Sequence, residues 1–540
     1  MKEKHKTSTI LITIFIIICL FAASYYVFFY QKEETEKKVE EKEIDNRINP
    51  LGAPQAVFLK INRIRKKGIV DFMMNAGYAT NLLKKIPIKN PYFYPFIDGL
   101  RPGIGWRKKP SFTYTAVLDG YEYKRNALWT GWDTDYINQE FFRKVKEEQQ
   151  QTEVKLTIVE KEKKFTKTIE KEIEGFCVVY DFRYGNWTGD DYFNDSDGYG
   201  HYNGSNYEIW FNIRQTSYDG DDIPYWTEVN ILGTDPTVDD SKLDPDNDGI
   251  DTEWEWKWGY DPFKYDNHTY LDPDNDGLQN NEEYFMKKWL ANPFYREIYI
   301  ETDHEGKRLF RPLKITIKKG KILPIPRPKL EFTGDGWECL FWEESQQMLI
   351  ETFNEHGITV HIDDGCMGGG GELLPKREGN YNQEGGTVAE YYNNNFSDER
   401  KGIFRYVVIA SGGGWCHPQD NRHFYDTMCV PTSKRFFKNQ LAFAVSQRGR
   451  RIGRAVQVLH ELGHSLGLRR EEWAGVDCLN FSEYMNYKSS MNYYYFGLRY
   501  YGYSDGTHGE NDRNDWAALD LTYFQKPAQG MEGLGWEDWA

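Results

Sequence analysis

Short stretches of alternating apolar and polar residues recur in the first half of the chain. Alternation that involves β-branched and aromatic residues is typical of strands that bury one face. The residues 51–91 mix helical apolar spacing with many lysines and predict no particular element. We expect a β-sandwich-like module within residues 51–216, with strands at Phe112–Val117, Val154–Val159, Cys177–Tyr180 and Tyr207–Phe211.

Longer apolar runs and helical periodicity replace this alternation in the second half of the chain. They predict an α+β domain over residues 294–525, followed by a tail at 526–540. The elements expected in it are, in order, a strand at Arg296–Thr302, an amphipathic helix at Glu338–His356, strands at Ile358–Ile362 and Ile403–Ala410, and a helix that includes Arg451–Leu459.

The run Thr9–Tyr30 contains no charged residue and follows lysines at positions 2, 4 and 6. About 20 apolar residues span a bilayer, and flanking positive charges stay on the cytoplasmic side. We therefore predict a cytoplasmic tip and single-pass transmembrane anchor at residues 1–30, with the bulk of the chain outside the cytoplasm. Cleavage near Ala22-Ala23-Ser24 would instead give a secreted protein. The Lys/Glu-rich residues 31–50 are typical of a solvated stalk.

Composition supports a multidomain protein. The chain has 540 residues, of which 39% are hydrophobic, and this suffices for several cores. The net charge is −16, and no basic patch with interleaved aromatic residues stands out, which argues against nucleic acid as a partner. The run Gly368–Gly371 lacks the Gly-Lys-Ser/Thr ending of a phosphate loop, and we expect no organic cofactor.

Two acidic loops, Asp244–Glu255 and Asp272–Glu283, share the pattern D-x-D-x-D-G with glutamate at the twelfth place. Calcium takes 6–8 oxygen ligands, which carboxylates at alternate places, one backbone carbonyl and the closing glutamate can supply. The glycine allows the sharp turn that the loop needs. The predicted calcium ligands are Asp244, Asp246, Asp248, the Ile250 carbonyl and Glu255 in the first loop, and Asp272, Asp274, Asp276, the Leu278 carbonyl and Glu283 in the second.

A degenerate copy at Ser217–Glu228 precedes these loops and offers Asp219, Asp221 and Glu228 as further calcium ligands. In every copy the closing glutamate is followed shortly by Asp-Pro or Asn-Pro, so the copies form an internal repeat. This pattern resembles thrombospondin type-3 calcium repeats. The resemblance implies a rigid, calcium-dependent spacer over residues 217–293.

The segment His460-Glu461-Leu462-Gly463-His464 has the form H-E-x-x-H and lies inside a predicted helix. Histidines four apart lie on one helix face, roughly 5–6 Å apart at Cβ, and can bind one Zn²⁺. The glutamate between them can take a proton from a water held by that metal. Gly467 then provides a helix stop, because glycine accepts the left-handed conformation there.

The segment Lys488-Ser489-Ser490-Met491-Asn492-Tyr493 follows this helix and looks like a Met-turn. H-E-x-x-H-x-x-G together with S-x-M-x-Y resembles the metzincin zinc proteases. Met485 begins a competing Met-Asn-Tyr, and Met491 is preferred because a serine precedes it. The predicted order strand–helix–strand–strand–helix also matches the N-terminal subdomain of that clan.

The third zinc ligand departs from the clan. Metzincins place it three residues beyond the glycine, where this chain has Arg470, and a guanidinium cannot bind zinc. Asp477 lies in the next suitable turn, and a carboxylate is an acceptable ligand. His508 and Glu471 are the alternatives.

By resemblance, the activity is hydrolysis of peptide bonds in a protein or peptide substrate. Glu461 is expected to act as general base, and Tyr493 stands where some metzincins keep a tyrosine that stabilises the oxyanion, although a packed tyrosine is an equal alternative. Two classes of function therefore follow. One is a membrane-anchored extracellular zinc endopeptidase with Zn²⁺ and Ca²⁺ as its metals. The other is a calcium-stabilised surface or adhesion protein with an inactive protease fold, which Arg470 favours.

Overall fold

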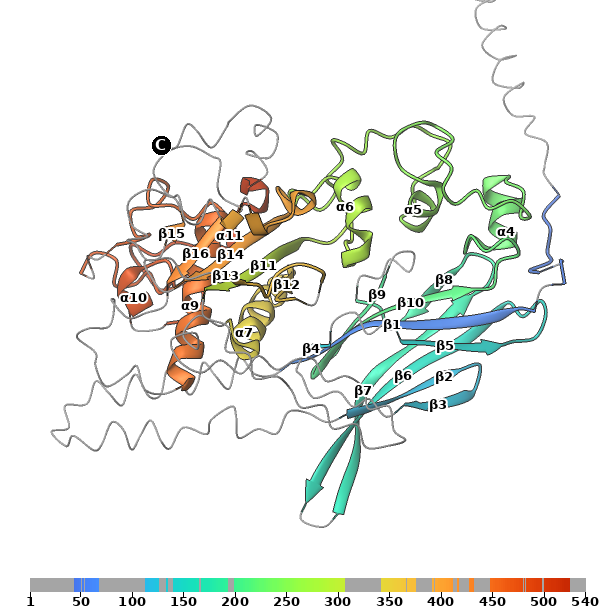
Figure 1. Cartoon of the computed structure of the whole chain (residues 1–540), viewed down its shortest axis with the longest axis horizontal. Coiled ribbons are helices and arrows are strands. Elements are labelled where there is room, and N and C mark those ends of the chain that lie inside the picture. The colour runs from blue at the N-terminus through green and yellow to red at the C-terminus, as the bar shows by residue number, and fades with distance from the viewer. Residues whose placement is uncertain are drawn as a thin grey trace, which may run out of the picture.

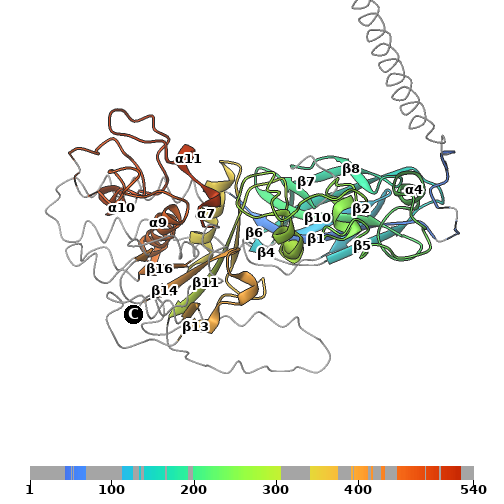
Figure 2. The same ribbon diagram turned by 90° about the horizontal axis from the view of Figure 1, so that it is seen from above.

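The computed structural model shows two units joined by a chain of acidic loops (Figures 1 and 2). A β-sheet unit occupies one end of the long axis, and a C-terminal unit of helices around a sheet occupies the other. The loop segment that carries α4, α5 and α6 runs along one side from the first unit to the second. The structure describes residues 43–67 except 50 and 53, 112–125, 133–134, 139–305 except 165–166 and 193–198, 341–374 except 366, 391–410 except 393, 415–416, 427–431, and 447–524 except 479, 481, 498 and 499.

The β-sheet unit contains two antiparallel sheets. One has the order β4-β1-β10-β9 with β5 also paired to β1, and the other has the order β3-β2-β6-β7-β8. All of their strand pairs are antiparallel. The strands are β1 Ala56–Lys66, β2 Phe112–Leu118, β3 Tyr121–Arg125, β4 Asp133–Thr134, β5 Gln139–Lys144, β6 Gln151–Lys164, β7 Lys167–Asp181, β8 Asn186–Gly189, β9 Gly200–Asn203 and β10 Tyr207–Gln215.

One buried cluster joins the two sheets, as alternation along the strands requires. Phe176 of β7 stacks on Phe211 of β10 with ring centroids 4.0 Å apart. The four strands expected from alternation all lie within longer observed strands. The strand β1 was not expected, because Asn62, Arg63 and Arg65 are buried in it and interrupt the apolar pattern.

Short helices follow the acidic loops. The segment Tyr225–Thr227 forms α4 and continues into a wider turn at Glu228–Leu232, α5 spans Thr252–Lys257, and α6 spans Asn280–Met286. The glycines at the sixth place of the two matched loops have positive φ, 99° for Gly249 and 95° for Gly277, as the sharp turn demands.

The C-terminal unit is built on a sheet with the order β12-β11-β14-β16-β15, and β13 also pairs with β11. The pairs are parallel except for the edge pair β15–β16, which is antiparallel. Strands lie at the three expected positions, whereas the short strands β13, β15 and β16 were not expected. The bounds are β11 Glu297–Glu305, β12 Thr359–Asp363, β13 Leu373–Leu374, β14 Phe404–Ala410, β15 Trp415–Cys416 and β16 Thr427–Pro431.

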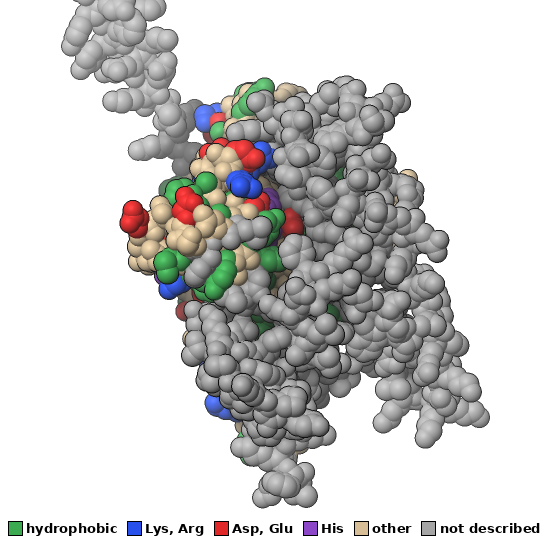
Figure 3. All heavy atoms as spheres, turned by 90° about the vertical axis from the view of Figure 1, so that its left-hand side faces the viewer, with side chains coloured by type: hydrophobic (Ala, Val, Ile, Leu, Met, Phe, Trp, Pro, Cys, Tyr) green, Lys and Arg blue, Asp and Glu red, His purple; other side chains and the backbone are tan. Residues whose placement is uncertain are grey.

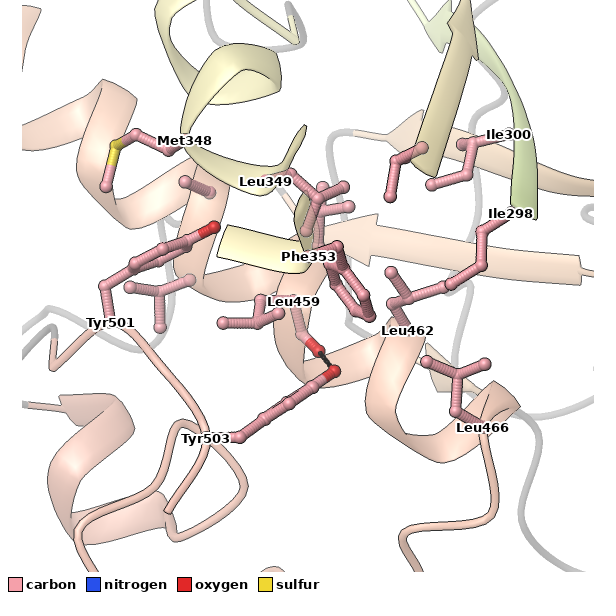
Figure 4. Close-up of a cluster of buried hydrophobic side chains, with 14 of the residues drawn as sticks. Ile298, Ile300, Met348, Leu349, Phe353, Leu459, Leu462, Leu466, Tyr501 and Tyr503 are labelled. Carbon is pink, nitrogen blue, oxygen red and sulfur yellow. Dashed lines mark hydrogen bonds between the residues drawn. The ribbon is translucent and has the colours of Figure 1, made fainter. Parts of the chain in front are cut away.

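Two helices pack together on this sheet and bury the core in Figure 4. They are α7, Glu343–Asn354, and α9, Gln447–Ser465. The α7 helix begins five residues later than expected, with Trp342 as its N-cap. Leu459 of α9 faces this core, and its carbonyl accepts a hydrogen bond of 2.7 Å from the Tyr503 hydroxyl. These contacts fix the position of the helix that carries H-E-x-x-H.

The expected anchor and tail lie outside the described residues. Among the helices that the structure describes, none is both long enough and apolar enough to span a bilayer. The apolar run Thr9–Tyr30 and the tail at 526–540 are not described, so the anchor stays a prediction. The side chains of the C-terminal unit visible in Figure 3 mix acidic, basic and apolar types.

Candidate metal centre

His460 and His464 lie one turn apart on the buried side of α9. The Nδ1 atom of His460 lies 2.9 Å from the Ser490 carbonyl oxygen, and that of His464 lies 2.8 Å from the Leu468 carbonyl oxygen. A carbonyl only accepts, so each Nδ1 carries the proton and each Nε2 presents a lone pair. The two Nε2 atoms lie 3.2 Å apart. Facing lone pairs at this distance repel each other unless a cation or a proton lies between them.

Asp477 completes the cluster from the loop after α9. Its carboxylate oxygens lie 3.2 Å from Nε2 of His460 and 3.6 Å from Nε2 of His464. The residue has a left-handed backbone with φ of 54°, which aspartate tolerates better than most residues. Its backbone N–H donates to the Met491 carbonyl at 2.9 Å, and this bond fixes the place where the loop returns to the helix. Oδ1 of Asp477 is buried and makes no hydrogen bond.

These three side chains fit zinc. Zinc bound by nitrogen and oxygen at 2.0–2.1 Å in a tetrahedron separates its ligand atoms by roughly 3.3–3.4 Å. The separations of 3.2, 3.2 and 3.6 Å match that edge length. Both imidazoles donate their second N–H to a carbonyl, as metal-binding histidines do. One tetrahedral position is left for water or substrate.

Charge also favours a cation at this position. Burial lowers the pKa of His464, but the Asp477 carboxylate outweighs burial and raises the pKa to about 8. Burial raises the pKa of Asp477, but its contacts with the His460 and His464 imidazoles outweigh burial and hold that pKa well below its usual value. The cluster therefore retains a proton that a bound divalent ion would displace.

The segment Lys488–Tyr493, predicted to be a Met-turn, packs against α9 at the position of the two histidines. Met491 is fully buried, and a Cβ at position 463 would collide with its sulfur, so glycine between the histidines permits this approach. The carbonyl that orients His460 belongs to Ser490, the residue before Met491. The competing Met485 is 50% exposed and is not in the core.

Aromatic rings cover one side of His460. Tyr493, the first residue of α10 (Tyr493–Gly497), stacks on the imidazole at 5.4 Å between centroids. Phe496 meets the same imidazole edge-on at 5.0 Å. Burial, and after it the Asp477 carboxylate, raise the pKa of Tyr493, so its hydroxyl keeps its proton at neutral pH. Phe496 was not predicted from the sequence, because its contact with His460 depends on the fold of the turn.

Apart from Glu461, the remaining candidates lie away from this cluster. Glu461 is on α9 between the two histidines and is 8% exposed. Arg470 and Glu471 are exposed. His508 belongs to a different cluster, where Nδ1 lies 2.9 Å from Asp512 and 3.6 Å from Asp505. Of the three alternatives for the third ligand, the fold brings Asp477 to the histidines.

The two matched acidic loops have the same internal bonds. In the Asp244 loop (Asp244–Glu255), the carboxylate of Asp244 accepts from the backbone N–H of Asp248 and Gly249. In the Asp272 loop (Asp272–Glu283), Asp272 accepts from Asp276 and Gly277 in the same way. The N–H groups of Ile250 and Leu278 donate to Asp248 and Asp276.

Both loops contain buried carboxylate oxygens that make no hydrogen bond, and this favours a bound cation in each loop. Both carboxylate oxygens of Glu255 and of Glu283 are buried without a hydrogen bond, as are Oδ2 of Asp246 and Oδ2 of Asp274. Burial, followed by the charges of neighbouring aspartates, raises the pKa of Glu283 well above its ordinary value. Carboxylates held this close fit calcium, which neutralises them and accepts many oxygens.

The degenerate Asp219 loop (Ser217–Glu228) gathers its expected ligands as well. Asp219, Asp221 and Glu228 place one ligand atom each within 4.8 Å of one another. Burial, and then the charge of Asp221, raise the pKa of Glu228 to about 9. Asp240, which the sequence did not single out, has a buried Oδ1 without a hydrogen bond, and Asp219 raises its pKa after burial does.

Comparison with known proteins adds no relative: no protein-family model matches the chain, and no curated protein matches it either.

Proposed function

We propose that the chain is a zinc-dependent endopeptidase whose metal is held by His460, His464 and Asp477. The observation that carries this proposal is the convergence of two Nε2 lone pairs and one carboxylate at tetrahedral spacing. When bound, zinc supplies Lewis acidity and lowers the pKa of water at the open position.

The remaining steps belong to side chains of this chain. The Glu461 carboxylate takes the proton from the attacking water and delivers it to the leaving amine. The Tyr493 hydroxyl, which keeps its proton, donates to the oxyanion that develops on the scissile carbonyl. The carbonyls of Ser490 and Leu468 hold the two imidazoles in the tautomer that offers Nε2.

The resemblance to metzincins supports the same reading. H-E-x-x-H-x-x-G lies at the end of α9, the methionine of S-x-M-x-Y packs beneath it, and strands and helices follow the order expected of that clan. Arg470 departs from the clan, and the Asp477 carboxylate replaces the ligand that Arg470 cannot supply. The acidic loops are proposed to bind calcium, and the apolar N-terminal run to anchor the protein with its bulk outside the cytoplasm.

The test compares zinc content and cleavage of a general protein substrate across variants. Glu461→Gln should retain one zinc per chain and lose hydrolysis by a factor of about 10²–10⁴, the usual contribution of a general base. His460→Ala and Asp477→Ala should lose both zinc and hydrolysis. Arg470→Ala and His508→Ala are matched controls and should keep both.

Two results would contradict the proposal. Equal zinc content in His460→Ala and the wild type would remove the metal site. Zinc-loaded wild type that cleaves no peptide or protein would favour the alternative, a calcium-stabilised surface or adhesion protein on an inactive protease fold.

A further inference from the structure

One histidine faces a loop that the calcium pattern describes as purely oxygen-lined. His268 lies in the connection between α5 and α6 and is 1% exposed. Its Nε2 atom lies 3.2 Å from Oδ2 of Asp248 and 3.6 Å from Oε1 of Glu255. Within the described part of the chain, this Nε2 makes no hydrogen bond, and neither does either carboxylate oxygen of Glu255.

These separations fit ligands of one cation. Ligand atoms bound to one ion at 2.1–2.4 Å lie roughly 3–3.5 Å apart. Asp248, Glu255 and His268 are all nine-tenths or more buried in their side chains. A buried nitrogen and two buried carboxylates that make no mutual hydrogen bonds are costly unless a cation satisfies them.

The far side of the imidazole is arranged for metal binding as well. In the structure, Nδ1 of His268 lies 2.9 Å from the side-chain nitrogen of Asn280, and the same nitrogen donates to the Tyr260 hydroxyl at 2.8 Å. The oxygen and nitrogen of such an amide exchange places by a half-turn, and the oxygen of Asn280 is otherwise buried without a partner. With the oxygen toward the ring, Asn280 accepts the Nδ1–H proton, and the Nε2 lone pair points at Asp248 and Glu255.

The repeat itself marks this position. His268 precedes Asp272 by four residues, and Asp240 precedes Asp244 by the same four. Asp240 faces the carboxylates of the Asp219 loop, as the effect of Asp219 on its pKa shows. Each segment that connects two acidic loops therefore places one side chain beside the carboxylates of the preceding loop. That side chain is a carboxylate for the Asp219 loop and an imidazole for the Asp244 loop.

We propose that Asp248, Glu255 and His268 form a mixed nitrogen–oxygen site that takes a first-row transition cation in preference to calcium. Imidazole suits cations such as Zn²⁺ and Ni²⁺, whereas calcium selects oxygen, and Mn²⁺ serves as the spectroscopic probe of the site. The proposal rests on the Asp244 loop binding a cation at all. It does not depend on peptidase activity, because the site is separate from His460 and His464.

The experiment uses the full chain, which first receives one equivalent of zinc, and then adds Mn²⁺. Electron spin-echo spectra of the bound Mn²⁺ should show nitrogen coupling in the wild type. His268→Asp, which copies the residue at the Asp240 position, should remove that coupling. It should also lower the affinity for Mn²⁺ relative to Ca²⁺ by about tenfold or more, since even outer partners of a metal ligand change affinity about 10–100-fold.

His508→Gln is the matched control, because His508 also lies beside two carboxylates. This variant should keep both the coupling and the affinity ratio. The same spectra of the His460→Ala, His464→Ala chain should keep the coupling too, since those imidazoles are not its source.

Three outcomes would overturn the inference. Bound Mn²⁺ without nitrogen coupling in the wild type would show an all-oxygen site and leave the calcium proposal standing. Coupling that survives His268→Asp would place the nitrogen elsewhere. If the Asp244 loop bound neither Mn²⁺ nor Ca²⁺, the proposal that this loop binds a cation and this inference would both fail. The zinc proposal would still stand on its own test.

Discussion

The Asp244 loop and the Asp272 loop have nearly the same sequence but different surroundings. The helix after the Asp244 loop packs in a small cluster of Ile250, Trp254 and Trp258. The helix after the Asp272 loop contributes Met286 to a cluster that includes strands of the C-terminal sheet. The same motif therefore closes a local turn in one place and forms part of a larger core in the other. The loop sequence predicts metal binding, whereas the structural role of the loop depends on what the next segment packs against.

Hydrogen bonds make the same distinction. Oδ2 of Asp276 accepts a bond of 2.8 Å from the backbone N–H of Glu297, the first residue of β11. Oδ2 of Asp248 accepts instead from Asp266, in the connection between the loops. The expected boundary between residues 293 and 294 thus has buried contacts across it.

The Asp272 loop also begins a buried polar chain that reaches the β-sheet unit. The Glu297 carboxylate lies 2.7 Å from Nε2 of His361 on β12, and Nδ1 of His361 lies 3.1 Å from the guanidinium of Arg63 on β1. All three side chains are buried. Removing one member leaves its neighbours short of one partner in a medium where that is expensive. Substituting one of these three side chains tests whether the Asp272 loop, unlike the Asp244 loop, is connected to the β-sheet unit.

Chelation should have the largest effect, because it acts on every loop at once. Buried carboxyls with raised pKa values, such as Glu228 at about 9 and Glu282 at about 7, bind more protons in the folded chain than in the unfolded one, where they titrate near pH 4. The free energy of unfolding of the chelated protein should therefore fall as pH rises from about 4 toward 9. Calcium should remove much of this fall, because it holds the loop carboxylates ionised. Denaturant titrations at several pH values, with and without calcium, measure how the free energy of unfolding changes with pH. A chelated protein that gains stability over this range would contradict the argument.

The matched pair Glu283→Gln and Glu255→Gln separates the two loops. Each change removes one proposed cation ligand and can forfeit up to about 2.7 kcal/mol at a hundredfold excess of the cation over Kd. Glu283→Gln should lower the global melting temperature and reduce hydrolysis, because the Asp272 loop is bonded to β11. Glu255→Gln should mainly open residues 244–270 to proteolysis. Equal effects on hydrolysis would remove the distinction.

His361→Leu tests the buried chain without touching either loop. It leaves Glu297 and Arg63 short of one partner each, and an unsatisfied buried group costs about 1–3 kcal/mol. Tyr299→Phe, which removes only a hydroxyl bond to the same Glu297, is the milder control at about 0.5–1.5 kcal/mol. Urea unfolding curves compare the two. A smaller loss for His361→Leu than for Tyr299→Phe would show that His361 does not connect the units.

The smallest difference is expected between Gly249→Ala and Gly277→Ala. Both glycines have positive φ, so both changes carry about 1 kcal/mol or more of backbone strain. A Cβ at position 249 meets nothing within 4 Å, whereas one at position 277 lies 2.8 Å from the Thr522 backbone. Gly277→Ala should therefore destabilise the protein more, by the cost of displacing the segment after α11 (Asp515–Ala518). Equal melting temperatures would mean that this segment yields freely.

Local patterns predict the local parts of this structure. Alternation located the long strands, helical spacing located α7 and α9, and the loop motif located carboxylates that converge. The strand β1 was not predicted from the sequence, because Arg63 and Arg65 are buried against partners distant in sequence, among them Glu208 and His361. The short strands β15 and β16 were not predicted either, because their two and five residues show too little periodicity.

The proposed metal centre also shows that local patterns do not predict contacts between segments distant in sequence. The spacing of His460 and His464 on one helix places them together, and the sequence left Asp477, His508 and Glu471 open as the third ligand. The choice depends on where a loop returns, which depends on the bond between Asp477 and Met491. His268 and Asp240 were missed because their partners belong to the preceding loop, and their only signal in the sequence is the shared spacing of four residues before the next loop.

The bond between the Asp477 N–H and the Met491 carbonyl has a consequence for how chain length varies at this centre. It anchors the ligand to the Met-turn, so the distance along the chain from His464 to Asp477 does not set the ligand's position. Loop closure changes only slowly with length, and residues can be inserted among the exposed positions 470–472 at little cost while that anchor holds. A search pattern with fixed spacing after H-E-x-x-H therefore overlooks such centres. A pattern that counts backward from the methionine, with an acidic residue that pairs with its backbone, would find them.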